Sequence, residues 1–248
     1  EDLRARGVGQ VVAYDIKQGS ADEASLREHA GRHGVRLAAS HAERATAASR
    51  LLLFGRRLAE SGRTREAAGI ARSLLAGYSA PGEEHIRSAA LTLYLDAVGE
   101  KEGLALLLET AASPDREFRQ KALDIAAGLR TSWQPSAWIE LLDRTDPDIQ
   151  ADIIRLLDRR GETAALPAIR EKLRTGESQV KAVAAVAAAR MGGPDTWDDI
   201  VPLFASGDPA EIRAAKTAVS LFPSDFLIPR IVAVLPHTPP AAQIELLG

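Results

Sequence analysis

The sequence contains no cysteine, which excludes disulfides, thiolate nucleophiles and cysteine-based zinc sites together. Aromatic residues make up only 4% of its 248 residues, although 46% are hydrophobic. A core must therefore be built from Ala, Leu, Ile and Val. That composition favours packed helices over a sandwich of strands.

Long apolar runs and an excess of positive charge are missing as well. The longest purely apolar run, Ala182 to Ala189, is bounded by Lys181 and Arg190. It falls far short of the roughly 20 residues that span a bilayer. The net charge is −3, with a pI near 6.0. We therefore expect no transmembrane helix, and the charge argues against a nucleic-acid partner.

Motifs for catalysis and metal binding are not found in the sequence. It has neither a G-x-S-x-G elbow nor a phosphate-binding Walker loop. His29 and His33 stand four residues apart, but without a third ligand they are best interpreted as a solvated pair. We predict no catalytic residues, no metal, no cofactor and no small-molecule substrate.

An acidic segment between residues 143 and 152 has the composition of a calcium loop but lacks the loop's central glycine and terminal glutamate. Carboxylates are favoured at helix N-termini. We interpret Asp143, Asp146, Asp148 and Asp152 as helix caps.

A repeat of about 31 residues dominates the last two thirds of the chain. The apolar residues that open successive helical segments are separated by 32, 31, 31, 32 and 32 residues; they are Ile86, Phe118, Ile149, Val180, Ile212 and Ile244. We call these six residues the anchors, and we expect their side chains to lie between neighbouring layers of helices. Each anchor's segment leads through a turn into a second apolar segment, so each unit is predicted to be a helix, a turn and a helix.

Turn residues support these helix boundaries. Asp146-Pro147 and Asp208-Pro209 precede first helices, where a capping side chain and a proline in the first turn are favourable. Gly99, Gly161 and Gly192 fall near the ends of first helices, where glycine adopts a left-handed cap without strain. The segment from Val180 to Gly192 is rich in alanine, and we predict that it is an inner helix with packed neighbours on two sides.

The segments "GDPAEIRAAKTAVS" and "SPDREFRQKALDIA" carry an Asp or Asp-Pro start, an apolar-Arg pair and alanine-rich positions. They resemble HEAT repeats, particularly the short type of phycobilin-lyase-like bacterial proteins. The resemblance covers residues 84–248, as five repeats plus the start of a sixth. It implies an all-α fold, a right-handed α-solenoid of antiparallel helix hairpins, that binds partners on its concave side.

Residues 1–83 are less regular. Residues 41–83 predict another helical hairpin, and "SGRTREAAGIARSLL" resembles half of a tetratricopeptide unit. Residues 1–40 predict a helical or irregular segment, with a capping box from Ser20 to Glu23. The chain opens at Glu1, and we expect that both ends are cut from a longer protein.

Cationic residues recur once per unit beside loop acids such as Asp115, Glu177, Asp208 and Glu211. We interpret them as a ladder of ion pairs between repeats rather than as a phosphate-binding stripe. The cations are Arg87, Arg119, Lys181 and Arg213.

These patterns predict a non-catalytic protein-interaction scaffold that binds a protein partner or an adjacent domain of a longer chain. The candidate contact residues lie in second helices or inter-helix turns, and two of them are tryptophans expected to be partly exposed. They are Trp133, Arg170, Arg174, Trp197 and Arg230. The alternative is a HEAT-like DNA glycosylase or another nucleic-acid-acting enzyme, with Trp197, Asp198 and Asp199 beside a flipped nucleotide.

Overall fold

The computed structural model describes residues 12–13, 36–37, 41–80, 82–129 and 133–247, and almost all of them lie in helices. The chain divides into two compact units, residues 1–104 and residues 105–248. The prediction of an all-α fold is confirmed apart from two short strands, which pair in parallel. They are β1 (Val12–Ala13) and β2 (Arg36–Leu37).

The first unit holds α3 (His41–Glu60), α4 (Thr64–Gly77), α5 (Glu84–Val98) and the start of α6 (Glu100–Ala111). Helix α4 packs against both α3 and α5. The predicted capping box at Ser20 and the pair His29 and His33 lie outside the described residues.

A buried arginine ties the start of α3 to the far end of α4. Arg44 donates to the carbonyl of Gly77 at 2.8 Å and forms an ion pair of 2.9 Å with Glu83. The Tyr78 hydroxyl donates to the Arg44 carbonyl at 3.0 Å, and burial raises the pKa of Tyr78. The cluster closes the hairpin at the end where α3 begins.

The second unit begins within α6 and continues as alternating first and second helices. Its elements are α7 (Arg116–Gly128), α8 (Pro135–Arg144), α9 (Pro147–Arg160), η1 (Thr163–Ala165), α10 (Leu166–Thr175), α11 (Ser178–Gly192), η2 (Gly193–Thr196), α12 (Trp197–Ile200), η3 (Val201–Ala205), α13 (Pro209–Val219), α14 (Ser224–Val234), η4 (Leu235–His237) and α15 (Pro240–Leu247).

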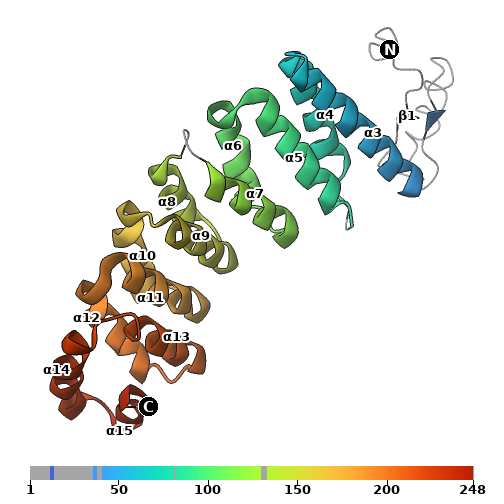
Figure 1. The fold of residues 1–248 in the computed structure, drawn as a ribbon. Coiled ribbons are helices and arrows are strands. Elements are labelled where there is room, and N and C mark those ends of the chain that lie inside the picture. Colours follow the sequence, from blue (N-terminus) through green and yellow to red (C-terminus); the bar gives the residue numbers. More distant parts are fainter. Residues whose placement is uncertain (1–11, 14–35, 38–40, 81, 130–132, 248) are drawn as a thin grey trace. The chain divides into compact units, whose positions relative to one another are not determined.

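The first helices of this unit form one layer. Helix α9 packs against α7 and α11, and α11 packs against α13. The second helices α8 and α10 pack against α9 and α11, respectively (Figure 1). This stack of helix hairpins is an α-solenoid, as predicted, and its handedness stays a prediction.

Helix α11 occupies the interior of the stack. Val180 and Ala184 are fully buried, and Ala187, Ala188 and Ala189 are at most 3% exposed. Because α11 contacts α9, α10 and α13 at once, residues bulkier than alanine would force these helices apart. The alanine-rich sequence is therefore a packing requirement.

The first three anchors of the second unit are buried, and the last two are more exposed. Phe118, Ile149 and Val180 are at most 9% exposed, whereas Ile212 is half-buried. Ile244 is 71% exposed, so the expectation that all the anchors lie between layers is wrong for this residue. Ile244 lies on α15, and no described helix follows α15 to cover it.

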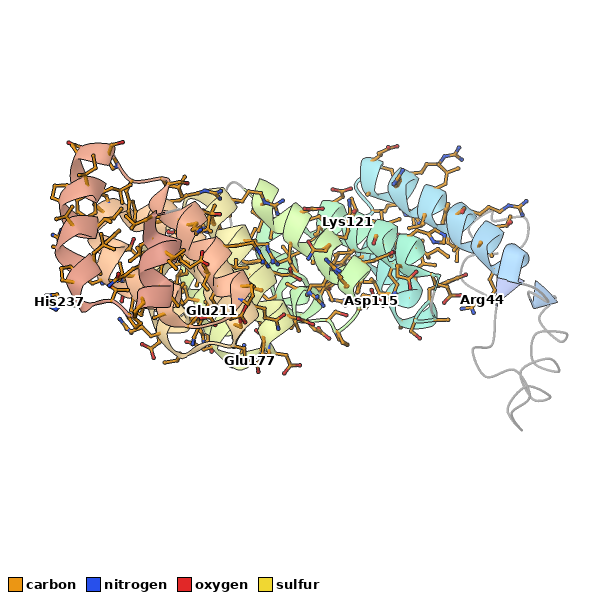
Figure 2. All side chains as sticks on the ribbon, turned by 90° about the horizontal axis from the view of Figure 1, so that it is seen from below. Arg44, Asp115, Lys121, Glu177, Glu211 and His237 are labelled. Atoms are coloured by element: carbon orange, nitrogen blue, oxygen red, sulfur yellow. The ribbon has the colours of Figure 1, made fainter. Side chains whose placement is uncertain are left out.

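Helix starts follow the sequence prediction in part. The Asp115 and Asp208 carboxylates accept hydrogen bonds from Phe118 N–H at 3.1 Å and Ala210 N–H at 2.7 Å. Asp146 stands at the cap position of α9, but its side chain makes no capping hydrogen bond. Asp115, Glu177 and Glu211, at the starts of α7, α11 and α13, are labelled in Figure 2.

Three glycines at the ends of first helices have a positive φ, namely Gly99, Gly161 and Gly193, and of these Gly161 adopts the left-handed helical conformation. Gly161 has a φ of 64° and donates to the Asp158 carbonyl at 2.9 Å. At the end of α11, Gly193 has a φ of 56°, whereas Gly192 is still helical, so the predicted cap lies one residue further on. No helix in the described residues is both long and apolar enough to cross a membrane.

Candidate interaction surface

The second helices share one stripe of side chains that faces the core. Trp138, Ile169 and Ile200 are separated by 31 residues each, and all three are fully buried. One turn further on, Leu142, Leu173 and Phe204 are at most 3% exposed. Because this stripe serves packing, the outward positions of the same helices are the ones available to a partner.

The outward positions carry charges that pair between neighbouring second helices. Arg170 on α10 donates to Asp199 on α12 at 2.6 Å, and Arg174 reaches the other oxygen of the same carboxylate at 3.2 Å. Lys172 reaches back to Asp143 on α8 at 3.0 Å. These pairs bring Arg170 and Arg174, two predicted contact residues, together on one surface.

Arg174 is the more accessible of the two arginines. Its side chain is 53% exposed, and it also pairs with Glu171 at 2.9 Å. The hydrogen bond to Glu171 raises the pKa of Arg174, so the guanidinium stays charged.

Trp133 is held between two other side chains. The Arg160 guanidinium lies 4.0 Å from the centre of its ring, and the ring of Trp138 stacks on it at 5.4 Å. The indole N–H donates to Glu162 at 2.7 Å. Trp133 is half-buried, and these contacts fix the segment before α8 against the end of α9.

Trp197 does not have the partial exposure expected from the sequence. It is 3% exposed and meets the ring of Phe226 edge-on at 6.1 Å. The expectation failed because Phe226 lies in the next repeat, and helix α14 of that repeat covers the indole. Arg230 is exposed, with its guanidinium 5.3 Å from the centre of the Phe226 ring.

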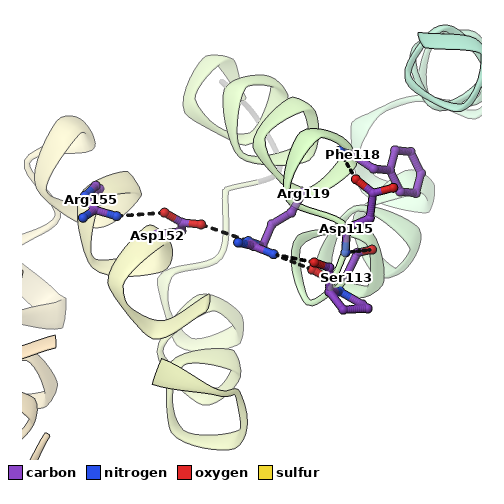
Figure 3. A network of polar contacts seen from close by, with 7 residues as sticks. Ser113, Asp115, Phe118, Arg119, Asp152 and Arg155 are labelled. Carbon is purple, nitrogen blue, oxygen red and sulfur yellow. Dashed lines mark hydrogen bonds and ion pairs between the residues drawn. The ribbon is translucent and has the colours of Figure 1, made fainter. Parts of the chain in front are cut away.

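The first helices are joined by a buried network that the sequence did not reveal. Arg119 on α7 donates to Asp152 on α9 at 2.9 Å and to the Ser113 carbonyl at 2.7 Å. The other Asp152 oxygen accepts from Arg155 at 2.8 Å (Figure 3). Asp152 is therefore an ion-pair partner between repeats, and its interpretation as a helix cap is wrong.

The predicted cation ladder is present at Arg119, but with a different partner. Arg119 pairs with Asp152 of the next first helix instead of a loop acid. Other pairs between first helices join Arg159 to Asp124 and Arg190 to Asp158. The partners lie 32 to 35 residues apart in the sequence, and local pattern analysis does not identify them.

The geometry offers little support for base excision or metal chemistry. Asp199 already accepts from two arginines, and the adjacent Trp197 is buried, so neither is presented to a flipped nucleotide. Within the described part of the chain, no three His, Asp or Glu side chains gather as a metal site. Asp143 pairs with Lys172, so its interpretation as a helix cap is also wrong.

The fold and the ion pairs between neighbouring repeats define an α-solenoid of stacked helix hairpins. Residues 135–220 match the family model of HEAT repeats, and this part of the chain consists of HEAT repeats. No curated protein and no solved structure matches the chain. The finer resemblance to the phycobilin-lyase-like type stays a prediction.

Proposed function

We propose that this chain is a non-catalytic protein-interaction module that binds a partner protein, or an adjacent domain of a longer chain, across its second helices. HEAT repeats commonly serve as protein-interaction scaffolds, and the repeats of residues 135–220 support this role. The contact surface is formed by α8, α10 and the segment from α12 to η3. We call this surface the second-helix surface.

The second helices bury one row of side chains and expose another, and this arrangement is the observation that carries the proposal. One stripe is fully buried in the core, whereas the outward positions repeat from helix to helix with exposed polar groups such as Glu140, Glu171 and Arg174. Ile139, Arg170 and Val201 are half-buried in one row beside them. Exposed charges beside part-apolar rows suit a protein partner with a complementary charge pattern.

Arg170 and Arg174 are the centre of this surface. Both arginines pair with the Asp199 carboxylate, which is 8% exposed, so this buried carboxylate fixes the positions of the two guanidinium groups. Arginine is enriched at interface hot spots because its planar fork can bind a carboxylate with two hydrogen bonds. Trp133 and Arg230 stay candidate contacts at the rims, and Trp197 supports the surface from the core.

The balance of charge favours a protein over a nucleic acid. The second-helix surface interleaves Lys172, Arg170 and Arg174 with acidic side chains, and each of the three cations is already paired. A phosphate-binding groove needs several cations free to replace counterions. The acidic net charge of the chain adds to this argument.

Site-specific photocrosslinking tests the proposal. A photoreactive amino acid is placed at Glu171 on the second-helix surface and, in a matched variant, at Arg155 on α9, since both positions are exposed helical sites. We expect a protein adduct that forms from position 171 and is lost in Arg174→Glu. Equal adducts from both positions, or no protein adduct from position 171, would contradict the proposal.

A further inference from the structure

Helix α3 of the first unit, labelled in Figure 1, exposes a row of arginines with one leucine in its middle. Arg50, Leu53 and Arg57 are separated by three and four residues, and all three are exposed. This spacing places them on one face of the helix. Arg56 is exposed beside them. We call these four residues the arginine face.

The arginines of this face are not neutralised within the chain. None of the ion pairs formed by the described residues includes Arg50, Arg56 or Arg57, although Glu60 is exposed one turn further along α3. The only acid of α4 is Glu66, and it pairs with Arg63 at 2.6 Å. The three guanidinium groups of the arginine face can therefore pair with acids from another molecule.

Helix-end electrostatics does not account for this concentration of positive charge. Cations are favoured in the last turn of a helix, which explains Arg57. Arg50 lies about 15 Å before the end of α3, outside the reach of that effect. Residues 41–77 contain seven arginines, no lysine and three glutamates, whereas the whole chain has a net charge of −3. The first helical hairpin is thus a basic segment of an acidic chain.

Leu53 provides the arginine face with an apolar centre. It is 53% exposed, and no other large hydrophobic residue in the described part of the first unit is as exposed. Phosphate groups offer nothing to bury such a side chain. A helix that carries an aliphatic residue between acidic ones can cover Leu53 and pair with the arginines at the same time.

We propose that the arginine face binds an acidic amphipathic α-helix of a partner protein, with an aliphatic side chain over Leu53 and carboxylates opposite Arg50 and Arg57. These two arginines are two turns apart, about 10 Å along the axis, and acids seven residues apart on the partner helix match that separation. The planar fork of arginine binds a carboxylate with two hydrogen bonds. The inference goes beyond the proposed function, which concerns α8, α10 and the segment from α12 to η3.

Two designed peptides test this pairing against the full chain. Both are alanine-rich helices of about 20 residues, long enough to be helical in water. One carries Glu-x-x-Leu-x-x-x-Glu and the other the reverse order, for parallel and antiparallel docking. We expect saturable NMR shifts of the Leu53 methyl groups with at least one peptide. A peptide of the same composition with its leucine moved to the opposite face should bind about fivefold more weakly.

Charge reversal identifies the arginines as the binding groups. Arg50→Glu combined with Arg57→Glu should weaken binding about tenfold or more, and should create binding to a peptide whose glutamates are replaced by lysine. The matched control, Arg116→Glu with Lys121→Glu on α7, changes two exposed cations and should stay within about twofold of the parent. No saturable shift with either peptide, or no binding of the lysine peptide to the reversed chain, would overturn the inference.

Phosphate polyanions and a second copy of the chain are the competing occupants. Duplex DNA and phosphatidylglycerol vesicles should bind more weakly than the peptide at the same ionic strength. Tighter binding of either one that Leu53→Ser leaves unchanged would assign the arginines to phosphate and overturn the inference. A dimer in sedimentation that Arg57→Glu dissociates would also overturn it, whereas a monomer agrees with it. Crosslinking at position 171 reports on a different surface, so its failure would leave this result unaffected.

Discussion

Arg119 on α7 and Asp152 on α9 lie 33 residues apart in the sequence, and 2.9 Å separates Nε of the arginine from Oδ2 of the aspartate. Both residues are at least 92% buried, at 4% and 8% exposure. The pair joins two first helices through the interior of the stack. Repeat spacing thus positions ionic contacts as well as apolar ones.

Removing one member of this pair should be costly. Asp152→Ala leaves the Arg119 guanidinium buried without its carboxylate, and we expect a loss of about 3 kcal/mol in the free energy of unfolding. Denaturant unfolding monitored by circular dichroism measures it. Asp124→Ala, which breaks the exposed pair with Arg159, is the matched control and should cost about 0–1 kcal/mol. Equal losses would show that burial does not decide the outcome.

A larger side chain at Ala184 should disturb the stack. Ala184 is fully buried in α11, so Ala184→Leu forces the flanking helices apart and should cost about 1–3 kcal/mol in the free energy of unfolding. Ala105→Leu, at an exposed helical position on α6, should stay within about 0.5 kcal/mol of the parent. Thermal unfolding of both variants provides the comparison. A harmless Ala184→Leu would contradict the close approach of helices at α11.

The clamp at Trp133 should depend on arginine specifically. The Arg160 guanidinium donates to three carbonyls at the end of α7, those of Ala126, Ala127 and Leu129, while it stacks on Trp133. Arg160→Lys keeps the charge but loses the planar fork, and we expect it to cost about 1.5–3 kcal/mol. Tryptophan fluorescence should also shift towards that of a solvated indole. Full retention of stability and emission by the lysine variant would refute the clamp.

Asp208 should report the contact between the starts of α11 and α13 as a pH effect. The Ser178 hydroxyl donates to its carboxylate, and this bond, followed by the Ala210 N–H, holds the pKa of Asp208 below its usual value. Because the folded pKa is lowered, the stabilisation is present above the unfolded value of 3.8 and is lost as pH falls through the folded pKa.

Ser178→Ala tests this coupling directly. NMR titration of the Asp208 carboxyl should show a pKa that moves up towards the usual value when the hydroxyl is removed. The stability difference between Ser178→Ala and the parent should be present at neutral pH and shrink in acid. An unchanged pKa would mean that the serine does not bind the carboxylate in solution.

The spacing of residues in the sequence predicts the stacked hairpins because burial recurs with the repeat. Ile149 and Val180 occupy equivalent positions, and both are buried as expected. The alanine-rich α11 is likewise predicted, since close helix packing leaves a direct mark on composition.

The contacts that sequence analysis did not predict join residues from different repeats. Asp152 has the local signature of a helix start, and only the fold brings Arg119 to it. Trp197 lies beside a turn, but Phe226, 29 residues later, covers it. For Ile244, periodicity identifies the position but does not reveal what covers it, because burial depends on the next hairpin. Of the candidate contact residues, Arg170 and Arg174 are brought together, whereas Trp133 and Arg230 lie against other partners.

The salt dependence of any nucleic-acid binding separates the two functional classes. If the chain were a DNA-acting enzyme, a gel shift with duplex DNA would weaken steeply as salt rises, because phosphate contacts release counterions. We expect no shift at 150 mM salt, about the physiological ionic strength. A salt-sensitive shift that Arg170→Ala and Arg174→Ala reduce would favour the enzymatic alternative.

Each hairpin buries the second helix of the one before it. The most direct measurement compares the same substitution at one repeat position in three repeats: Ile169→Ala, Ile200→Ala and Ile231→Ala. We predict that the first two, which truncate fully buried side chains, cost about 2–5 kcal/mol in the free energy of unfolding, and that the half-buried Ile231 costs less than half as much. Equal costs at all three positions would contradict the claim.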